Sequence, residues 1–261
     1  MSTLVWAVSD SATMIRRSVL LSMRSIDALL MSVLLPVLLM LVFVYVFGGA
    51  ISTQAAPGAQ STSYVDYVVP GIILLCAGYG SSMTAVSVNS DMRNGVIDRF
   101  QSMPIVSSAV LTGHVTAALL RNTVSMLLVV GTAALLGFRP EAGVLAWVVA
   151  VGLIWLFMLA IGWLSAAVGL ATSSAEAAGG ATFFMLFVPY LSSAFVPTQT
   201  MPSALQWVSE NQPVTPVIET LRGLLMGTPV GASGWQAVLW CGGLAVVGYV
   251  WATYLFRRRS R

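Results

Sequence analysis

The sequence contains no lysine, a single histidine and two cysteines, and it has few charged residues of either sign. All twelve of its basic residues are arginines, and only 8% of the 261 residues are charged. Soluble domains are about 25% charged, so this composition excludes a soluble globular protein. With 57% hydrophobic residues and a mean hydropathy of +0.88, the chain is predicted to be a membrane protein.

Each of these absences also excludes a class of chemistry. Without lysine the chain cannot form a P-loop, whose lysine contacts nucleotide phosphates, or a lysine Schiff base. His114 alone cannot build a zinc site of several histidines. Cys76 and Cys241 lie within long apolar stretches, which favours small buried side chains over a disulfide or a metal site. We therefore expect no catalytic residue, no metal and no cofactor in this chain.

Six stretches are long and apolar enough to cross a bilayer, whose hydrocarbon core of about 30 Å needs roughly 20 helical residues. They are residues 28–47, 67–88, 110–136, 144–171, 179–196 and 235–256. The predicted fold class is an all-α membrane protein, with six transmembrane helices in one domain over residues 28–256. Residues 1–27 carry several charges and no uninterrupted apolar core, so we expect no cleaved signal peptide there.

Arginines set the predicted orientation, because the cytoplasmic loops of membrane proteins are enriched in basic residues. With the N-terminus inside, nine arginines fall on the inner side, including those of the basic tail 257–261, and only Arg139 and Arg222 fall outside. An even number of spans then places both termini in the cytoplasm. The expected location is a bacterial plasma membrane, whose anionic inner face attracts the tail, and no nucleic-acid partner is expected.

Arg121 is the one arginine within a predicted span. Counting about 20 residues back from Gly137 places the inner boundary near residue 117, so its guanidinium is expected to reach the headgroups. No carboxylate lies in the middle of a span, where ion-coupled transporters need one. The sequence therefore disfavours an ion-coupled transporter or channel that works without an ATPase, and we keep this function only as the alternative. An intramembrane enzyme would need His114, which is expected at the exposed cytoplasmic end of its helix.

Two amphipathic segments are predicted on the inner side. In residues 1–27, apolar residues recur at helical spacing opposite the arginines, which predicts a helix lying in the membrane interface. In the inner loop of residues 89–108, Ser90 is expected to cap a short helix that ends at Pro104. A short helix of mixed charge suits docking in a groove on another protein. Its composition is equally compatible with a simple interfacial connector.

The outer segment of residues 197–232 is too long and too regularly patterned for a plain connection. Residues 204–210 are expected to form one short helix. Thr215, followed by proline, is expected to cap a second helix, which Gly227 ends. We expect these two amphipathic helices to be either re-entrant or a lid over the ends of the spans.

Two motifs in these polar segments resemble a known family. The inner loop carries Arg93-Asn94-Gly95-Val96-Ile97-Asp98-Arg99-Phe100, followed by Met103-Pro104-Ile105. The outer segment carries Pro197, Met201-Pro202, Trp207, Gln212-Pro213-Val214-Thr215 and Leu221-Arg222. With the order of segments over nearly the whole chain, these motifs resemble the membrane permease of the type-2 ABC exporters, close to the daunorubicin-resistance permease group. Asp98 departs from the family pattern, in which a glutamate is common.

The resemblance implies a half-transporter. Two permease chains, identical or related, would form a pathway at their interface, and each would dock a separate P-loop ATPase subunit that binds ATP and Mg. The positions implied to couple to the ATPase are Arg93, Gly95, Asp98, Arg99, Phe100 and Pro104. The positions implied to form an outer gate or release motif are Pro202, Trp207, Pro213, Glu219 and Arg222, of which the last two are spaced to pair on a helix.

The expected function is export, by alternating access, of an amphipathic or hydrophobic molecule such as an antibiotic or a lipid. Flexible methionines and flat aromatic rings suit ligands of varied shape. The candidates for lining the substrate pathway are Met40, Phe43, Phe47, Phe183, Phe184 and Phe187. Contact with lipid or with neighbouring helices is the alternative for these side chains.

Overall fold

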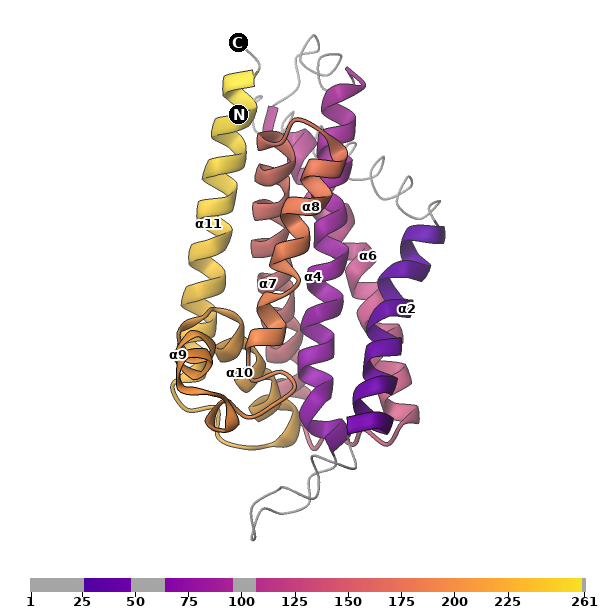
Figure 1. Ribbon diagram of the computed structural model, residues 1–261, viewed down its shortest axis with the longest axis vertical. Helices are drawn as coiled ribbons and strands as arrows, with labels where there is room; N and C mark the ends of the chain where they lie inside the picture. Colours follow the sequence, from indigo (N-terminus) through magenta and orange to yellow (C-terminus); the bar gives the residue numbers. More distant parts are fainter. Residues whose placement is uncertain (1–25, 48–63, 96–106, 260–261) are drawn as a thin grey trace.

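A computed structural model of the protein describes residues 26–47, 64–95 and 107–259 (Figure 1). Over these ranges the chain is helical, without a β-strand, which agrees with the predicted fold class. The longer helices are α2 (Ile26–Val42), α4 (Tyr64–Arg93), α6 (Ser107–Leu135), α7 (Val144–Ala171) and α11 (Ser233–Arg259). The shorter helices are η1 (Phe43–Phe47), α8 (Ala175–Met185), η2 (Val188–Leu191), η3 (Thr198–Thr200), α9 (Ser203–Asn211) and α10 (Val214–Met226). The interfacial helix predicted over residues 1–27 lies almost wholly outside the described residues.

Four of the described helices, α4, α6, α7 and α11, are long and apolar enough to cross a membrane. The bounds of α7 match the predicted span 144–171 at both ends. Two further apolar segments are shorter: Ser32–Val46, in α2 and η1, and Ala175–Leu191, in α8 and η2. The helices α9 and α10 gather at the end of the bundle opposite the C-terminus (Figure 1). Following the predicted orientation, we call this end of the bundle the outer end.

The fifth predicted span, residues 179–196, is not one continuous helix. α8 ends at Met185, and a turn and the short 3-10 helix η2 follow. The break has a local cause, because Pro189 lacks the N–H that would bond the carbonyl of Met185 four residues earlier. The predicted fifth span is therefore interrupted in the structure near Pro189.

α4 packs against α2, α6, α7 and α8, and α7 also packs against α11. Small residues allow the closest approaches, as is common between membrane helices. A Cβ added at Gly169 of α7 would overlap the carbonyl oxygen of Ala85 in α4, and one at Gly71 would stand 2.6 Å from the Cβ of Ala194. Cys76 and Cys241 are buried and free, as predicted.

The two outer helices pack on the ends of the spans. α10 contacts α4, α7 and α11, and α9 contacts η2, η3 and α10. Gly227 ends α10 with φ of +67°, a left-handed conformation suited to glycine, which confirms the predicted end. The predicted start is wrong, because Pro213 occupies the N-cap position. The Thr215 hydroxyl instead donates to the carbonyl of Ser209 at 2.6 Å, which ties α10 to α9.

Candidate functional site

The inner end of α4 is tied to the end of α7 by Asn89. Its side-chain amide donates to the carbonyls of Gly169 at 3.0 Å and Thr172 at 2.9 Å. The last carbonyls of a helix lack partners within the helix, and Asn89 supplies a donor to them. Asn89 is 1% exposed, so this contact fixes α4 to α7 close to the start of the inner loop.

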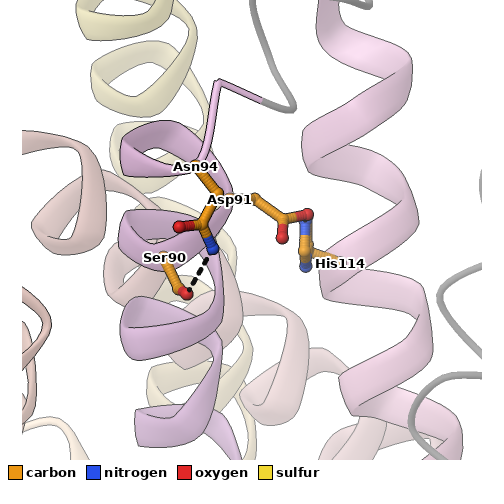
Figure 2. Close-up of polar contacts among 4 residues, drawn as sticks. All are labelled: Ser90, Asp91, Asn94 and His114. Carbon is orange, nitrogen blue, oxygen red and sulfur yellow. Dashed lines mark hydrogen bonds and ion pairs between the residues drawn. The ribbon is translucent and has the colours of Figure 1, made fainter.

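On its other side, the inner end of α4 meets α6. The carboxylate of Asp91 lies 3.2 Å from Nε2 of His114, and Figure 2 shows the two side chains pointing toward each other across the two helices. His114 is 12% exposed, so the expectation of an exposed histidine is wrong. The pair joins the helix that enters the inner loop to the helix that leaves it.

Ser90 does not cap a new helix, because α4 continues through Arg93. The hydroxyl of Ser90 instead accepts a hydrogen bond from the Asn94 side chain at 3.3 Å (Figure 2). The chain then turns at Gly95, whose φ of +65° favours glycine. The predicted cap at Ser90 is wrong because the second helix continues past its predicted end at residue 88, where Asn89 and Met92 contact the neighbouring helices.

The first turn of α8 also lies near this end of α4. The hydroxyl of Ser174 caps α8 by accepting from the N–H of Ala177 at 3.1 Å. Hydrogen bonds from the backbone of Glu176 and from the Ser174 side chain hold the pKa of Glu176 below its usual range, and the charge of Arg93 acts in the same direction. Asn89 and Asp91 thus bond α4 to α7 and α6, and the charge of Arg93 acts on Glu176 in the first turn of α8. We call Asn89, Asp91 and Arg93 the inner hub.

Two of the six residues predicted to couple to an ATPase lie in this region. Arg93 ends α4 with an exposed side chain, and Gly95 forms the turn that follows. Asp98, Arg99, Phe100 and Pro104 lie outside the described residues, so their predicted contacts stay predictions. The inner hub stands directly before this segment, and His114 follows it in α6.

At the outer end, Arg222 of α10 connects three segments of the chain. Its Nη2 donates to the carbonyls of Ser193 at 2.8 Å and Tyr67 at 3.1 Å. The guanidinium also lies 3.8 Å from the centre of the Tyr67 ring, a cation–π distance. The Tyr67 hydroxyl donates to the same Ser193 carbonyl at 3.0 Å. We call Arg222, Tyr67 and Ser193 the outer tie.

The other residues predicted in the outer motif are dispersed. Glu219 is exposed and accepts from the Ser233 hydroxyl at 3.1 Å, so the pair predicted between Glu219 and Arg222 is replaced, within the described residues, by other partners for both. Trp207 is 68% exposed on α9. Pro202 and Pro213 occupy the N-cap positions of α9 and α10.

The predicted pathway residues fall into two groups. Met40 is fully buried, and Phe43 stacks on Phe195 with ring centres 4.2 Å apart, so both pack within one chain. Phe183, Phe184 and Phe187 have exposed side chains on or just after α8. Phe47 ends η1, and its side chain lies outside the described residues. Among the predicted pathway residues whose side chains the structure describes, the group at α8 is therefore the one that presents a surface to lipid or to a second chain.

Arg121 lies at the midpoint of α6 rather than near its inner end. Its guanidinium donates to the carbonyl of Gly80, in the middle part of α4, at 2.9 Å. The neighbouring Asn122 donates to the carbonyl of Ala77 at 3.3 Å. Charged side chains inside membranes commonly bond backbone carbonyls of the bundle. The expectation that Arg121 reaches the headgroups is therefore wrong.

Comparison with known proteins identifies the family of this chain. Residues 11–226 match the ABC-2 type transporter family, a stretch that includes the inner hub and the outer tie. The chain belongs to this family. It is thus an ABC permease, as the two sequence motifs indicated.

Two relatives are drug-resistance permeases by name. The daunorubicin resistance ABC transporter permease protein DrrB1 of Streptomyces coeruleorubidus is 31% identical over 224 residues, which cover 85% of this permease and 77% of the relative. The probable doxorubicin resistance ABC transporter permease protein DrrC of Mycobacterium tuberculosis is 27% identical over 229 residues, covering 88% of this permease and 81% of the relative.

Sequence reasoning missed several residues that hold the permease together. Asn89 was counted as the start of a loop, although a buried amide can cap a neighbouring helix. Tyr67 was placed within an apolar span, with no signal of its contact with Arg222. For Asn89 the sequence held one signal of this contact, namely a polar residue at the end of an apolar run.

Proposed function

We propose that this permease is the membrane subunit of an ATP-driven exporter of amphipathic or hydrophobic molecules. The observation that carries the proposal is the inner hub, which bonds α4 to α6 and α7 directly beside the loop of residues 96–106, while α8 packs on α4 as well. A force applied to that loop by a partner would reach four helices together. Drug resistance in the names of two relatives supports the same class of molecule.

The partner at this loop is a separate ATPase subunit carrying the P-loop, with its bound ATP and Mg. Arg93 and Gly95 set the direction in which the loop leaves α4, and Arg99 and Phe100 contact the ATPase. Closure of an ATPase pair then moves the inner ends of the helices and switches the pathway from inward access to outward release. Reaction chemistry resides in the ATPase, and the permease supplies the pathway.

A second permease chain completes the pathway. The exposed phenylalanines Phe183, Phe184 and Phe187 of the α8 region face this partner, which is either a copy of this chain or a related permease. The chain crosses a bacterial plasma membrane six times, with α2 and the broken α8–η2 segment as the first and fifth crossings. Both termini lie in the cytoplasm, and the outer tie contributes to the release side.

The first test is gentle affinity purification of the permease from its native membranes, followed by identification of its partners. A P-loop ATPase in stoichiometric amount is expected, with or without a second permease. A chain that purifies alone and moves solute in vesicles without ATP would instead identify an ion-coupled transporter or channel.

The second test replaces both Arg99 and Phe100 with alanine. Because these side chains are proposed to contact the ATPase, the variant should insert normally, lose ATPase co-purification and lose export. Arg258→Ala, which removes an exposed arginine from the inner end of α11, is the matched control and should keep both. Normal export by the double variant would refute the coupling contact.

A further inference from the structure

A groove of about 610 Å³ lies between α11 and the outer helices α9 and α10, which surround the outer end of α11 (Figure 1). On α11 its lining runs from Trp235, in the first turn of the helix, to Val247, near the midpoint. Twelve residues of helix cover about 18 Å, slightly more than half of a hydrocarbon core of about 30 Å. The groove therefore has the length of one leaflet of the bilayer.

The two ends of the groove differ in polarity. At the outer end it is lined by Glu210 and Asn211, the last two residues of α9, and by Gln236 at the start of α11. Toward the middle of α11 the lining is apolar and includes Leu244 and Val247. A polar end at the membrane surface, followed by an apolar stretch as deep as one leaflet, matches the two parts of a lipid molecule.

The groove is accessible from the side of the molecule. Trp235, Leu239 and Val247 are 58%, 63% and 58% exposed, and a Cβ added at Gly243 would meet nothing within 4 Å. Because α11 is long and apolar enough to cross a membrane, its exposed apolar side is expected to contact lipid. A lipid chain can therefore enter the groove laterally from the bilayer.

The outer end of the groove favours a positively charged group. Among the described residues that line the groove, Glu210 carries the one charged side chain, and it is exposed. One of its oxygens accepts a hydrogen bond from Gln206 at 2.9 Å, and a carboxylate can accept several more. The C-terminal end of α9 adds a negative partial charge at the same place. The rings of Trp235 and Trp240 attract an ammonium group as well.

We propose that this groove binds a phospholipid of the outer leaflet whose headgroup carries an ammonium group, as phosphatidylethanolamine does. The ammonium group lies at Glu210 and Trp235, Gln236 offers a neutral donor to the phosphate, and one acyl chain follows α11 past Gly243. Phosphatidylglycerol has no ammonium group, and it would bring a net negative charge beside Glu210 where no described lining residue is basic. The inference goes beyond export, and it uses the predicted orientation only to name the leaflet.

The test titrates lipids into the delipidated permease in detergent and counts the bound lipids by native mass spectrometry. The two probes are phosphatidylethanolamine and phosphatidylglycerol with the same palmitoyl and oleoyl chains, so that they differ in the headgroup alone. Because a charge pair at an exposed site raises affinity by up to about fivefold, phosphatidylethanolamine should bind about fivefold more tightly than phosphatidylglycerol.

Two pairs of variants locate the site. Glu210→Gln should reduce the preference to less than about twofold. Glu141→Gln should leave it intact, because Glu141 is another exposed carboxylate, near the end of α10, that does not line the groove. Gly243→Leu should fill the groove and lower phosphatidylethanolamine binding to the level of phosphatidylglycerol. Gly242→Leu is its control, because an added Cβ there also meets nothing within 4 Å but lies outside the groove.

Equal binding of the two lipids to the wild type would overturn the proposal, and so would a preference that survives Glu210→Gln or Gly243→Leu. The same spectra separate monomer from dimer. A preference found in the monomer and lost in the dimer would identify the groove as a surface between subunits, which also contradicts the proposal. The test uses neither ATPase nor transport, so its failure is distinguishable from failure of the proposed export function.

Discussion

Arg222 holds α10 against α4 and the turn that follows η2. Its guanidinium donates to two backbone carbonyls, those of Tyr67 and Ser193, and lies over the Tyr67 ring. Arginine suits this position because its planar group offers several donors in a fixed geometry. A residue without donors would remove both Arg222 hydrogen bonds in a largely buried location and leave the Ser193 carbonyl only the Tyr67 hydroxyl.

We therefore predict that Arg222→Leu lowers the free energy of unfolding by about 1.5–3 kcal/mol, the range for hydrogen bonds to charged groups. The measurement is an SDS titration in mixed micelles, followed by tryptophan fluorescence. Arg139→Leu is the control. Arg139 is also an outer arginine, but it is exposed and bonds the carbonyls of Ala134 and Phe138 beside it, so its loss should change stability by less than about 0.5 kcal/mol. Unchanged stability of Arg222→Leu with slower export would instead assign Arg222 to release alone.

Single residues also mark where prediction from the sequence reached its limit. The burial of Cys76 and the helix end at Gly227 follow from local composition and backbone preference, and both were predicted. The position of Arg121 depends on how α6 is aligned with α4, because the carbonyl of Gly80 became its partner only through that alignment. Periodicity along one helix contains no information on such an alignment.

At the scale of elements, α4 and α7 form a close contact near their inner ends. Gly169 faces the backbone of Ala85, and Asn89 donates to the carbonyl of the same glycine. Because the two backbones nearly touch, the contact depends on a residue without a side chain. The Asn89 hydrogen bonds can form only while this approach is maintained.

Gly169→Ala should therefore separate α7 from α4 and lower the free energy of unfolding by about 1–3 kcal/mol, the usual cost of overpacking. Gly152→Ala in the same helix is the matched control, because an added Cβ there has nothing within 4 Å. The same SDS titration compares the two variants. Equal stability of the two variants would show that the α4–α7 contact is looser than the structure indicates.

Elements were easier to predict than their interruptions. Hydropathy located all four long helices, since a membrane-spanning helix must present apolar side chains along its whole length. The same measure does not distinguish α8 from η2, because both are apolar. The break reflects Pro189, whose missing N–H leaves no mark on a measure of hydropathy.

The whole molecule combines long and short apolar helices. α7 has 28 residues and α11 has 27, which correspond to about 42 and 40 Å of helix. α8 and η2 have 11 and 4 residues, and with the two turn residues between them they cover only about 28 Å. The hydrocarbon core is about 30 Å thick, so the fifth segment alone falls short of crossing it. α10 contacts η2 as well as α4, α7 and α11, and we infer that it occupies the remaining depth of the outer leaflet.

This arrangement predicts that the two ends of the short segment lie on opposite sides of the membrane. Ser173, before α8, and Gln199, in η3, are both exposed and can be replaced singly by cysteine, while the native Cys76 and Cys241 are buried and should react slowly. In intact cells an impermeant maleimide should label Gln199→Cys, and it should label Ser173→Cys only after the membrane is permeabilised. Labelling of both positions from the same side would mean that α8 and η2 enter and leave one face. The chain would then cross an odd number of times, and its termini would lie on opposite sides.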